Sequence, residues 1–230
     1  MKRLILLLPL LSVLVSACAV TDSPSPSEGW IDLHQGGIEA WVGGTTFDPA
    51  ALAELDEPER GERIAGWTAT VAEHWHVDGD ELVSDGHGPH LVTPVDYGDF
   101  ELELEWKIMP GGDSGLYLRG YPQVQIWDPW NEREHKNGSD KGSGGLWNND
   151  VHERWPAVRA DHRPGEWNHM RVTMRGSEVW VELNGHAIVE AVELDNYFRR
   201  GEPLLERGPV HLQTHGSEVR FRGVRIRPLD

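Results

Sequence analysis

Cysteine is almost absent from this 230-residue sequence, in which Cys18 is the only one. A single cysteine excludes a disulfide within the chain and argues against a cysteine-based zinc site or a cysteine nucleophile. Basic residues are also scarce, with 21 lysines and arginines against 38 aspartates and glutamates and a formal net charge of −17. Because nucleic-acid binding needs a basic surface to neutralise phosphates, we expect no nucleic-acid partner.

The sequence also lacks an apolar run long enough to span a bilayer comfortably. The longest candidate, residues 4–15, follows Lys2 and Arg3, and this length and these flanks are typical of a secretory signal. The run leads into Val-Ser-Ala-Cys at 15–18, which resembles the lipobox of bacterial lipoproteins, where cleavage precedes a lipid-modified cysteine. We therefore predict a lipoprotein signal peptide at 1–17 and lipidation of Cys18. The alternative is an ordinary cleaved signal with an incidental cysteine.

Residues 18–28 are predicted to be the lipidated cysteine and a Ser/Pro-rich tether that holds a domain off a membrane surface. Removal of residues 1–17 would take away Lys2 and Arg3 and no acid, leaving 19 basic and 38 acidic residues and a charge of −19. We expect an exported lipoprotein of the bacterial cell envelope, anchored to a membrane by its lipid. Ala19 and Val20 after the cysteine, with no aspartate there, are compatible with outer-membrane sorting, and the expected location is the outer membrane or a periplasm-facing one.

The remainder, residues 29–230, has a length that suits one domain. Many glycines, 11 tryptophans and recurring short strand-like runs predict an all-β sandwich. One short surface helix is expected within 48–62, because Asp48 can cap it and Pro49 suits its first turn. A strong hairpin signal lies at 178–189, where Asn184-Gly185 favours a type I′ turn.

The most informative stretch is residues 111–128, which reads as two short strands joined by a tight turn. Side chains alternate between the two faces of a strand, so this pattern predicts one buried, apolar face. The other face would carry the lining of a polar-ligand site: Tyr117, Arg119, Gln123, Gln125 and Trp127. The plain alternative is that these residues only close a sheet surface.

Three other segments are expected to contribute to this site. Residues 100–108 alternate strictly, and Glu105 is the carboxylate on that strand nearest the loop containing Asp113. Residues 208–216 place Gln213 and His215 on one strand face. The long stretch 129–165 has no clear periodicity but contains Trp147, which indicates a functional loop or lid. Amides and a guanidinium bind vicinal hydroxyls and indoles pack on pyranose rings, so a carbohydrate is the expected ligand.

At these residues the chain also resembles a known bacterial family, the 3-keto-glucoside-1,2-lyase and 3-keto-2-hydroxy-glucal hydratase domain, also named 3-keto-disaccharide hydrolase. The resemblance spans nearly all of residues 29–230. Its motifs stand at 96–102, 111–120, 122–128, 142–149, 165–172, 194–204 and 208–216. It implies a concanavalin A-like jelly-roll β-sandwich with a short helical insertion and a long loop over its concave face.

The resemblance further implies enzymes that act on glycosides already oxidised at C3 by a separate oxidoreductase. A C3 ketone acidifies the C2 proton, so a base can remove it, the C1 substituent can leave, and water can add to the resulting 2-hydroxy-glucal. This route needs a base, an acid and a group that stabilises the enolate oxygen. The expected activity is therefore a 3-keto-glycoside lyase or hydratase, or a net hydrolase.

Roles can be assigned to individual residues as hypotheses. His215 is the predicted base or acid because imidazole titrates near neutral pH, and Arg119 would stabilise the enolate. Asp128 is a further catalytic candidate. A divalent metal is possible as a Lewis acid, with Asp113 and His135 as candidate ligands, and no organic cofactor is expected. The substrate-binding candidates are Tyr117, Gln123, Gln125, Trp127, Gln213, Trp147 and Glu105.

A non-catalytic carbohydrate-binding lipoprotein is the alternative function, because similar sandwiches host many lectin-like modules. Gln123 stands where some members of the family carry a glutamate, and a neutral amide cannot act as a base there. A two-carboxylate glycosidase is a third reading, since Glu103 and Glu105 share a strand face, but nothing marks them as an acid and nucleophile pair.

Overall fold

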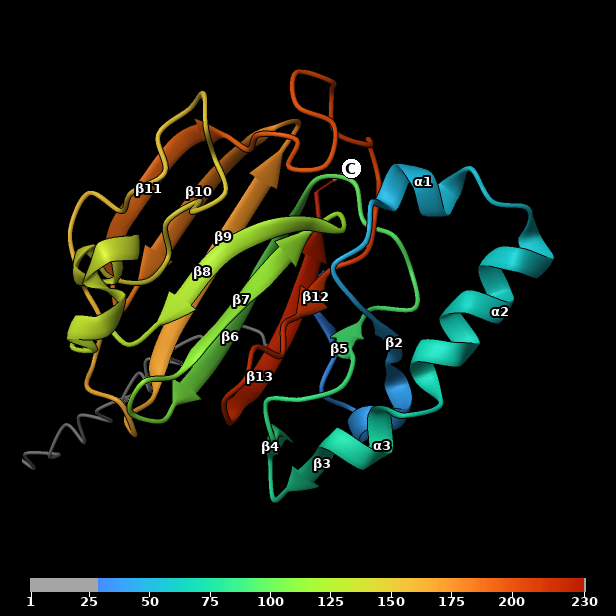
Figure 1. Ribbon diagram of the computed structural model, residues 1–230, viewed down its shortest axis with the longest axis horizontal. Helices are drawn as coiled ribbons and strands as arrows, with labels where there is room; N and C mark the ends of the chain where they lie inside the picture. The colour runs from blue at the N-terminus through green and yellow to red at the C-terminus, as the bar shows by residue number, and fades with distance from the viewer. Residues whose placement is uncertain (1–28, 230) are drawn as a thin grey trace, which may run out of the picture.

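The computed structural model describes residues 29–229, so the predicted signal peptide, Cys18 and the tether lie outside the described residues. Two antiparallel sheets stack on each other around a single apolar core (Figure 1). The fold prediction, an all-β jelly-roll sandwich, is confirmed. None of the helices within 29–229 has the length and apolarity needed to cross a bilayer.

The larger sheet has the strand order β11-β10-β9-β6-β13-β4-β3, with β1 added beside β13. Its strands are β1 (Ile31–Asp32), β3 (Trp75–Asp78), β4 (Glu81–Ser84), β6 (Phe100–Ile108), β9 (Asn168–Arg175), β10 (Glu178–Leu183), β11 (His186–Glu193) and β13 (Val219–Pro228). The smaller sheet has the order β2-β5-β12-β7-β8. Its strands are β2 (Val42–Gly44), β5 (His90–Val92), β7 (Asp113–Leu118), β8 (Tyr121–Trp127) and β12 (His211–Leu212).

Strand β6 shows how alternation in the sequence produces the two layers. Phe100, Leu102 and Leu104 point into the core and are at most 1% exposed. The intervening glutamates point outward from the sandwich, where they pair with arginines of β9 and β13. The expected β10–β11 hairpin is also present, and its turn has φ of 50° at Asn184 and 80° at Gly185, as a type I′ turn requires.

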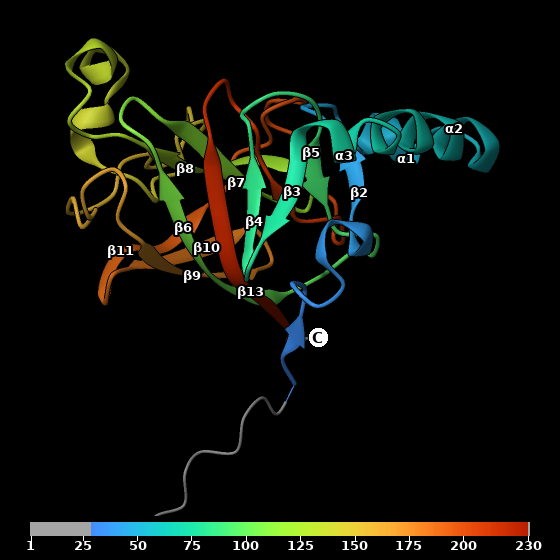
Figure 2. The same cartoon turned by 90° about the horizontal axis from the view of Figure 1, so that it is seen from below.

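The helical insertion is longer than the sequence predicts. Instead of one short helix there are α1 (Pro49–Ala53) and α2 (Glu57–Thr68), followed by α3 (Val71–His74). Asp48 caps α1 by accepting from the Ala50 N–H at 3.0 Å, as predicted, and Asp56 caps α2 in the same way. Figure 2 shows α1 and α2 projecting from the side of the sandwich next to β2.

Gly43 allows α2 to lie against the edge of the smaller sheet. A Cβ atom at this position would come within 2.5 Å of the Trp67 backbone, so only glycine permits the contact. Three short 3-10 helices complete the fold, namely η1 (Gly37–Ala40), η2 (Glu132–Asn137) and η3 (Ser139–Lys141). The last two belong to the long loop after β8, which lies on the opposite side of the smaller sheet from α1 and α2 (Figure 1).

Candidate functional site

A cavity of about 330 Å³ lies on the outer face of the smaller sheet, over β7, β8 and the segment that follows β12. This volume is in the range of small-molecule sites. The lining is mostly polar and aromatic: Thr46, Asp113, Tyr117, Pro122, Gln123, Gln125, Trp127, Glu134, Asn137, Trp147, Asn148, Tyr197, Gln213 and His215. The sequence predicted eight of these positions as site residues, and the structure brings them together.

The register of the strands explains why these side chains converge. Gln125 pairs with Gly115 and Trp127 with Asp113 across β7 and β8, so their side chains emerge on one face. Gly115 leaves room for the amides, because a Cβ atom there would lie 2.9 Å from Gln213 Oε1. The expected apolar partners of this hairpin, such as Leu116 and Ile126, are fully buried on the other face.

The amides of the cavity form two hydrogen-bonded groups, and one of these groups has an open acceptor. Gln123 donates to Gln125, and Gln125 Nε2 donates to Asp113 Oδ1 at 2.8 Å. Gln213 Nε2 donates to the Tyr117 hydroxyl at 3.2 Å, while Gln213 Oε1 is buried and accepts no hydrogen bond from any described residue. Buried polar atoms are nearly always paired, so this oxygen is suited to accept from a ligand hydroxyl.

Tyr117 stays a neutral hydroxyl in this setting. Burial raises its pKa to about 12, and its oxygen lies 2.7 Å from Thr46 Oγ1. Its ring stacks on His211 with centroids 5.2 Å apart, and His90 meets it edge-on. Burial lowers the pKa of both histidines, to about 4 for His90, so these two rings are uncharged supports for the tyrosine.

His215 and two carboxylates form the ionisable part of the cavity. His215 Nδ1 lies 3.3 Å from Asp113 Oδ2, and this contact raises the pKa of the imidazole above its ordinary value of 6.5. The charge of Glu134, on η2 across the cavity, acts in the same direction. A histidine whose pKa is raised by a neighbouring carboxylate can take up or release a proton in the cavity.

Two tryptophans form an apolar wall. Trp127 and Trp147 meet edge to face, with ring centroids 6.3 Å apart. Each indole N–H is already used, because Trp127 donates to the Gly142 carbonyl at 2.8 Å and Trp147 to the Asn137 carbonyl at 2.9 Å. The rings therefore offer carbon surface to a ligand. Trp147 comes from the long loop that the sequence predicts as part of the site.

Arg119 does not lie in this cavity, and its predicted position beside Tyr117 is wrong. The register of β7 and β8 shifts between Leu116 and Leu118, and Arg119 has φ of 53°, so strict alternation stops before this residue. Its guanidinium is buried, donating to the Gly98 carbonyl at 2.8 Å and to Asp99 Oδ1 at 2.8 Å. In this position Arg119 ties the end of the hairpin to the segment before β6.

The positions of Glu105 and Asp128 correct two further site predictions, and the position of Glu103 bears on the two-carboxylate alternative. Glu105 lies on the larger sheet, where it binds the guanidinium of Arg222 at 2.8 Å, because β6 belongs to the opposite layer. Asp128 accepts from the N–H groups of Gly111 and Trp130 at 2.8 and 2.9 Å, which makes it a loop cap outside the cavity lining. Glu103 is likewise bound by arginines, so the pair Glu103 and Glu105 faces away from the site.

The two proposed metal ligands are not brought together. Asp113 lines the cavity, whereas the Nε2 atom of His135 lies 3.1 Å from the Pro129 carbonyl and His135 is not part of the lining. Among the residues from 29 to 229, no three His, Cys, Asp or Glu side chains form a group that could hold a metal ion.

Sequence reasoning missed six lining residues, namely Pro122 in β8, Glu134 and Asn137 in η2, and Thr46, Asn148 and Tyr197 in loops. The most important is Glu134, the second carboxylate of the cavity. It lies in the aperiodic stretch after β8, where no strand alternation predicts which way a side chain points. The only indication in the sequence was that this stretch contains many residues of types that bind ligands or transfer protons.

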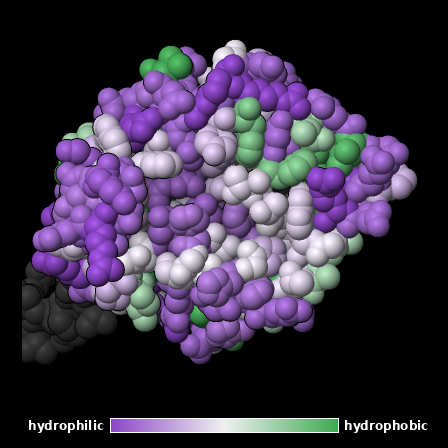
Figure 3. Space-filling model, viewed as in Figure 1, coloured by the Kyte–Doolittle hydropathy of each residue, from purple (hydrophilic) through white to green (hydrophobic). Residues whose placement is uncertain are grey.

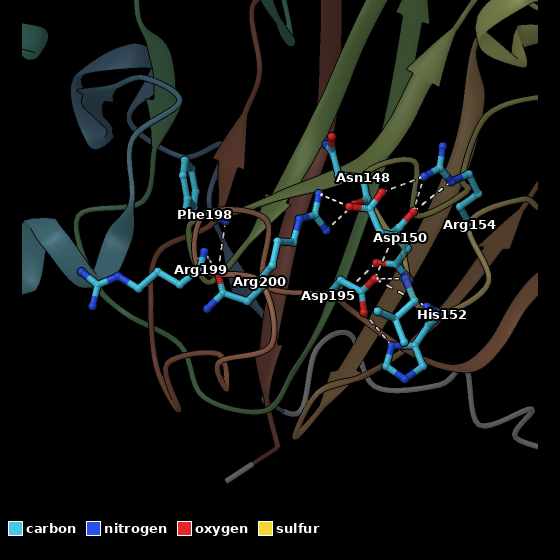
Figure 4. Close-up of polar contacts among 11 residues, drawn as sticks. Asn148, Asp150, His152, Arg154, Asp195, Phe198, Arg199 and Arg200 are labelled. Atoms are coloured by element: carbon cyan, nitrogen blue, oxygen red, sulfur yellow. Dashed lines mark hydrogen bonds and ion pairs between the residues drawn. The ribbon is translucent and has the colours of Figure 1, made fainter.

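The rim of the cavity is held by a network between two loops, drawn in Figure 4. Arg200 donates to the Asn148 carbonyl at 2.9 Å and lies over the Tyr197 ring, so it contacts both rim residues. Asp195 accepts from the N–H groups of Asp150 and Val151 at 2.6 and 2.7 Å and from His152 Nδ1 at 2.6 Å. Loops 148–154 and 193–200 are thereby fixed to each other.

Replacement of Asp195 by alanine is expected to lower the free energy of unfolding by about 2–3 kcal/mol, because several donors lose their acceptor. Burial acts to raise the pKa of Asp195, but the donors of Val151, Asp150 and His152 outweigh it and the net pKa is lowered. Its stabilising contribution is therefore present at neutral pH and is lost as the pH falls through the lowered pKa. Urea unfolding at pH 7 and pH 3 measures both effects; an equal loss at the two pH values would contradict this role.

Comparison with known proteins identifies related sequences and folds. The family model of the 3-keto-alpha-glucoside-1,2-lyase-like domain matches residues 53–227. A 3-keto-disaccharide hydrolase of Bacteroides thetaiotaomicron is 24% identical over 225 residues, covering 74% of this chain and 77% of that protein. A protein of Parabacteroides distasonis described as a glycosyl hydrolase has 24% identity and a TM-score of 0.57 over 68% of this chain and 91% of its own. A second structure from that organism gives a TM-score of 0.55 at 24% identity over 67% and 74%.

Proposed function

The chain belongs to the 3-keto-alpha-glucoside-1,2-lyase-like domain family, and from this premise we propose that it breaks the glycosidic bond of 3-keto-glycosides by elimination and then hydrates the product. The observation that carries the proposal is the pair His215 and Asp113, at 3.3 Å, facing Glu134 in a cavity lined by three glutamines and two indoles. The glutamines suit sugar hydroxyls and the indoles suit a pyranose face. The ionisable groups supply proton transfer where the sugar would lie.

The chemistry follows from the ketone of the substrate. A base of the cavity removes the proton from C2, the electron pair forms the enolate of the C3 ketone, and the C1–O bond breaks as the aglycone leaves with a proton. Water then adds across C1 and C2 of the 2-hydroxy-3-keto-glucal and gives the 3-keto sugar. Net hydrolysis therefore needs one proton acceptor and one proton donor, which His215 and Glu134 can provide in turn.

The enolate oxygen needs hydrogen-bond donors, and Arg119 is not part of the cavity lining and donates to Gly98 and Asp99 instead. Among the donors in the lining, we assign this role to the neutral hydroxyl of Tyr117 and the amides of Gln123 and Gln213. Because the pKa of Tyr117 is raised to about 12, its hydroxyl remains protonated at neutral pH and can stabilise developing negative charge. We assign the keto oxygen of the substrate to the part of the cavity where these donor side chains lie.

The proposal is tested by incubating the purified full-length chain with a 3-keto-glucoside and with its unoxidised parent while the release of the aglycone is followed. Cleavage of the keto compound alone supports the proposal. If both compounds bind and neither is cleaved, the protein is a carbohydrate-binding module and the catalytic roles are wrong.

The pH dependence of cleavage gives a second test. Asp113 raises the pKa of His215, so replacing Asp113 with asparagine is expected to lower that pKa. If unprotonated His215 is the base, kcat/KM falls as the pH drops through the pKa, and in the variant this fall shifts to lower pH. The control is Asp80→Asn, at an exposed turn outside the cavity lining. An unshifted profile in Asp113→Asn would show that His215 is not the titrating group.

A requirement for a divalent ion stays a proposal, since the predicted ligands Asp113 and His135 do not form a site. It is tested by the same assay after chelation and after addition of Mg²⁺, Ca²⁺ or Mn²⁺. Attachment to a membrane through lipidated Cys18 is proposed separately, and membrane extraction of the Cys18→Ser variant tests it.

A further inference from the structure

A second cavity, of about 390 Å³, lies on the same face of the smaller sheet beside the candidate site. It is lined by residues of β2, β5, the start of β12, α1 and α2. Figure 1 shows α1 and α2 on the side of the smaller sheet where β2 lies. The strand register places Val42, Val92, His211 and Tyr117 in one row across the sheet. The two cavities are therefore neighbours on one continuous surface.

The lining of the second cavity is more apolar than that of the candidate site. Phe47, Leu52, Ile64 and Trp67 contribute to its walls and are only half-buried, and the rings of Phe47 and Trp67 lie 5.8 Å apart. In Figure 3 hydrophobic surface gathers where α1 meets the sheet. Exposed apolar surface that is gathered in a hollow is a mark of a binding site.

Residues that line the two cavities are adjacent in the chain and in contact with each other. Thr45 lines the second cavity and Thr46 lines the candidate site. Thr46 is solvent-exposed and bonds to the Tyr117 hydroxyl at 2.7 Å, while the Tyr117 ring stacks on His211, which belongs to the second cavity. A ligand that fills the candidate site can thus extend over Thr46 into the second cavity.

The chemistry of the second cavity suits an apolar group better than a second sugar. The side-chain amides that line the candidate site are missing from its lining, and its polar side chains are two threonines, two arginines, one aspartate and His211. Burial lowers the pKa of His211 well below its ordinary value, so this side chain is uncharged at neutral pH. An aromatic or aliphatic ring would contact Phe47, Ile64 and Trp67.

We propose that the second cavity binds the apolar aglycone of a glycoside whose sugar ring lies in the candidate site. This inference rests on the proposed function for the identity of the sugar ring. It gives the substrate class as glucosides of apolar, ring-bearing alcohols, and it makes Trp67 and Phe47 the residues that select them.

Binding of two unoxidised glucosides to the full-length chain tests the inference without turnover. Methyl α-glucoside and 2-phenylethyl α-glucoside carry alcohols of similar acidity and differ in the apolar ring. By isothermal titration calorimetry the phenylethyl compound is expected to bind about tenfold more tightly or better. Equal affinities, or no binding of either compound, would overturn the inference.

Single substitutions test which residues produce the preference for the phenylethyl compound. Trp67→Ala is expected to remove the preference while the affinity for methyl α-glucoside is unchanged, and Phe47→Ala is a second variant in case the first does not fold. Trp30→Ala is the matched control, because Trp30 is also half-buried but lies against Arg225 and Arg227 of β13, on the larger sheet. A full preference retained in a folded Trp67→Ala or Phe47→Ala protein would contradict the assignment.

Cleavage of the 3-keto derivatives of both glucosides separates this inference from the proposed function. A binding preference without cleavage of either ketone would support the aglycone site and overturn the lyase proposal. Cleavage of both ketones at equal kcat/KM, with equal binding of the parents, would support the lyase proposal and overturn the aglycone site.

Discussion

Replacing His215 with alanine is expected to lower kcat for 3-keto-glucoside cleavage about 10²–10⁴-fold, the usual contribution of a general acid or base. His215 touches the candidate site only through its imidazole, which lies beside Asp113 and is exposed at the cavity. The amides and indoles that would bind the sugar are untouched by the change. We therefore expect the dissociation constant of the unoxidised glucoside to stay close to that of the wild type.

The measurement combines single-turnover cleavage with calorimetric binding, and the matched control is His186→Ala, an exposed histidine at the β10–β11 turn. Loss of cleavage in His215→Ala alone, with binding retained, assigns the proton transfer to this residue. Unchanged turnover would remove His215 from the mechanism and leave the carboxylates of Glu134 and Asp113 as the remaining proton carriers in the cavity.

Arg119→Met is expected to destabilise the protein by about 2–3 kcal/mol without affecting the chemistry. Removing one partner of a fully buried ion pair costs about 3–5 kcal/mol, and the loss is smaller here because Asp99 is 38% exposed along its side chain. The Gly98 carbonyl also loses its donor, and the methionine fills the space without replacing the hydrogen bonds. The expected decrease in Tm is about 5–10 °C for a domain of this size.

Thermal unfolding and cleavage kinetics of the same preparation separate structure from catalysis. Arg175→Met, at an exposed arginine of β9, is the control and should change the stability by less than about 0.5 kcal/mol. A large fall in kcat of Arg119→Met at a temperature where it is fully folded would restore the catalytic role that the sequence pattern suggests.

The sequence was informative wherever regular alternation decides the direction of a side chain. Gln125, Trp127 and Tyr117 were placed correctly, because β7 and β8 are paired in regular register over most of their length. Gln213 and His215 were placed with them, since the segment after β12 remains beside Gly115 through the Gln213 N–H. Alternation along a paired strand is a local property, and one sequence is sufficient to detect it.

Prediction failed where the backbone departs from regular strand geometry. It also failed where the position of a side chain depends on which of the two sheets its strand joins. Arg119 follows a register shift and has a positive φ, so counting by twos from Tyr117 gives the wrong face. Glu105 has the correct alternation but belongs to the other sheet, and sheet membership depends on pairing with β13 and β9, far along the chain. Glu134 and Tyr197 come from loops, whose directions are set by tertiary contacts.

The most direct test of the proposed function uses a 3-keto-glucoside deuterated at C2, its protiated form and the unoxidised parent, with the full-length chain. We predict that only the ketones release their aglycone, that deuterium slows this release, and that the label passes to the solvent faster than from substrate incubated without protein. Release of the aglycone from the parent at a similar rate, or cleavage of the ketone with the C2 label retained, would contradict elimination as the reaction of this site.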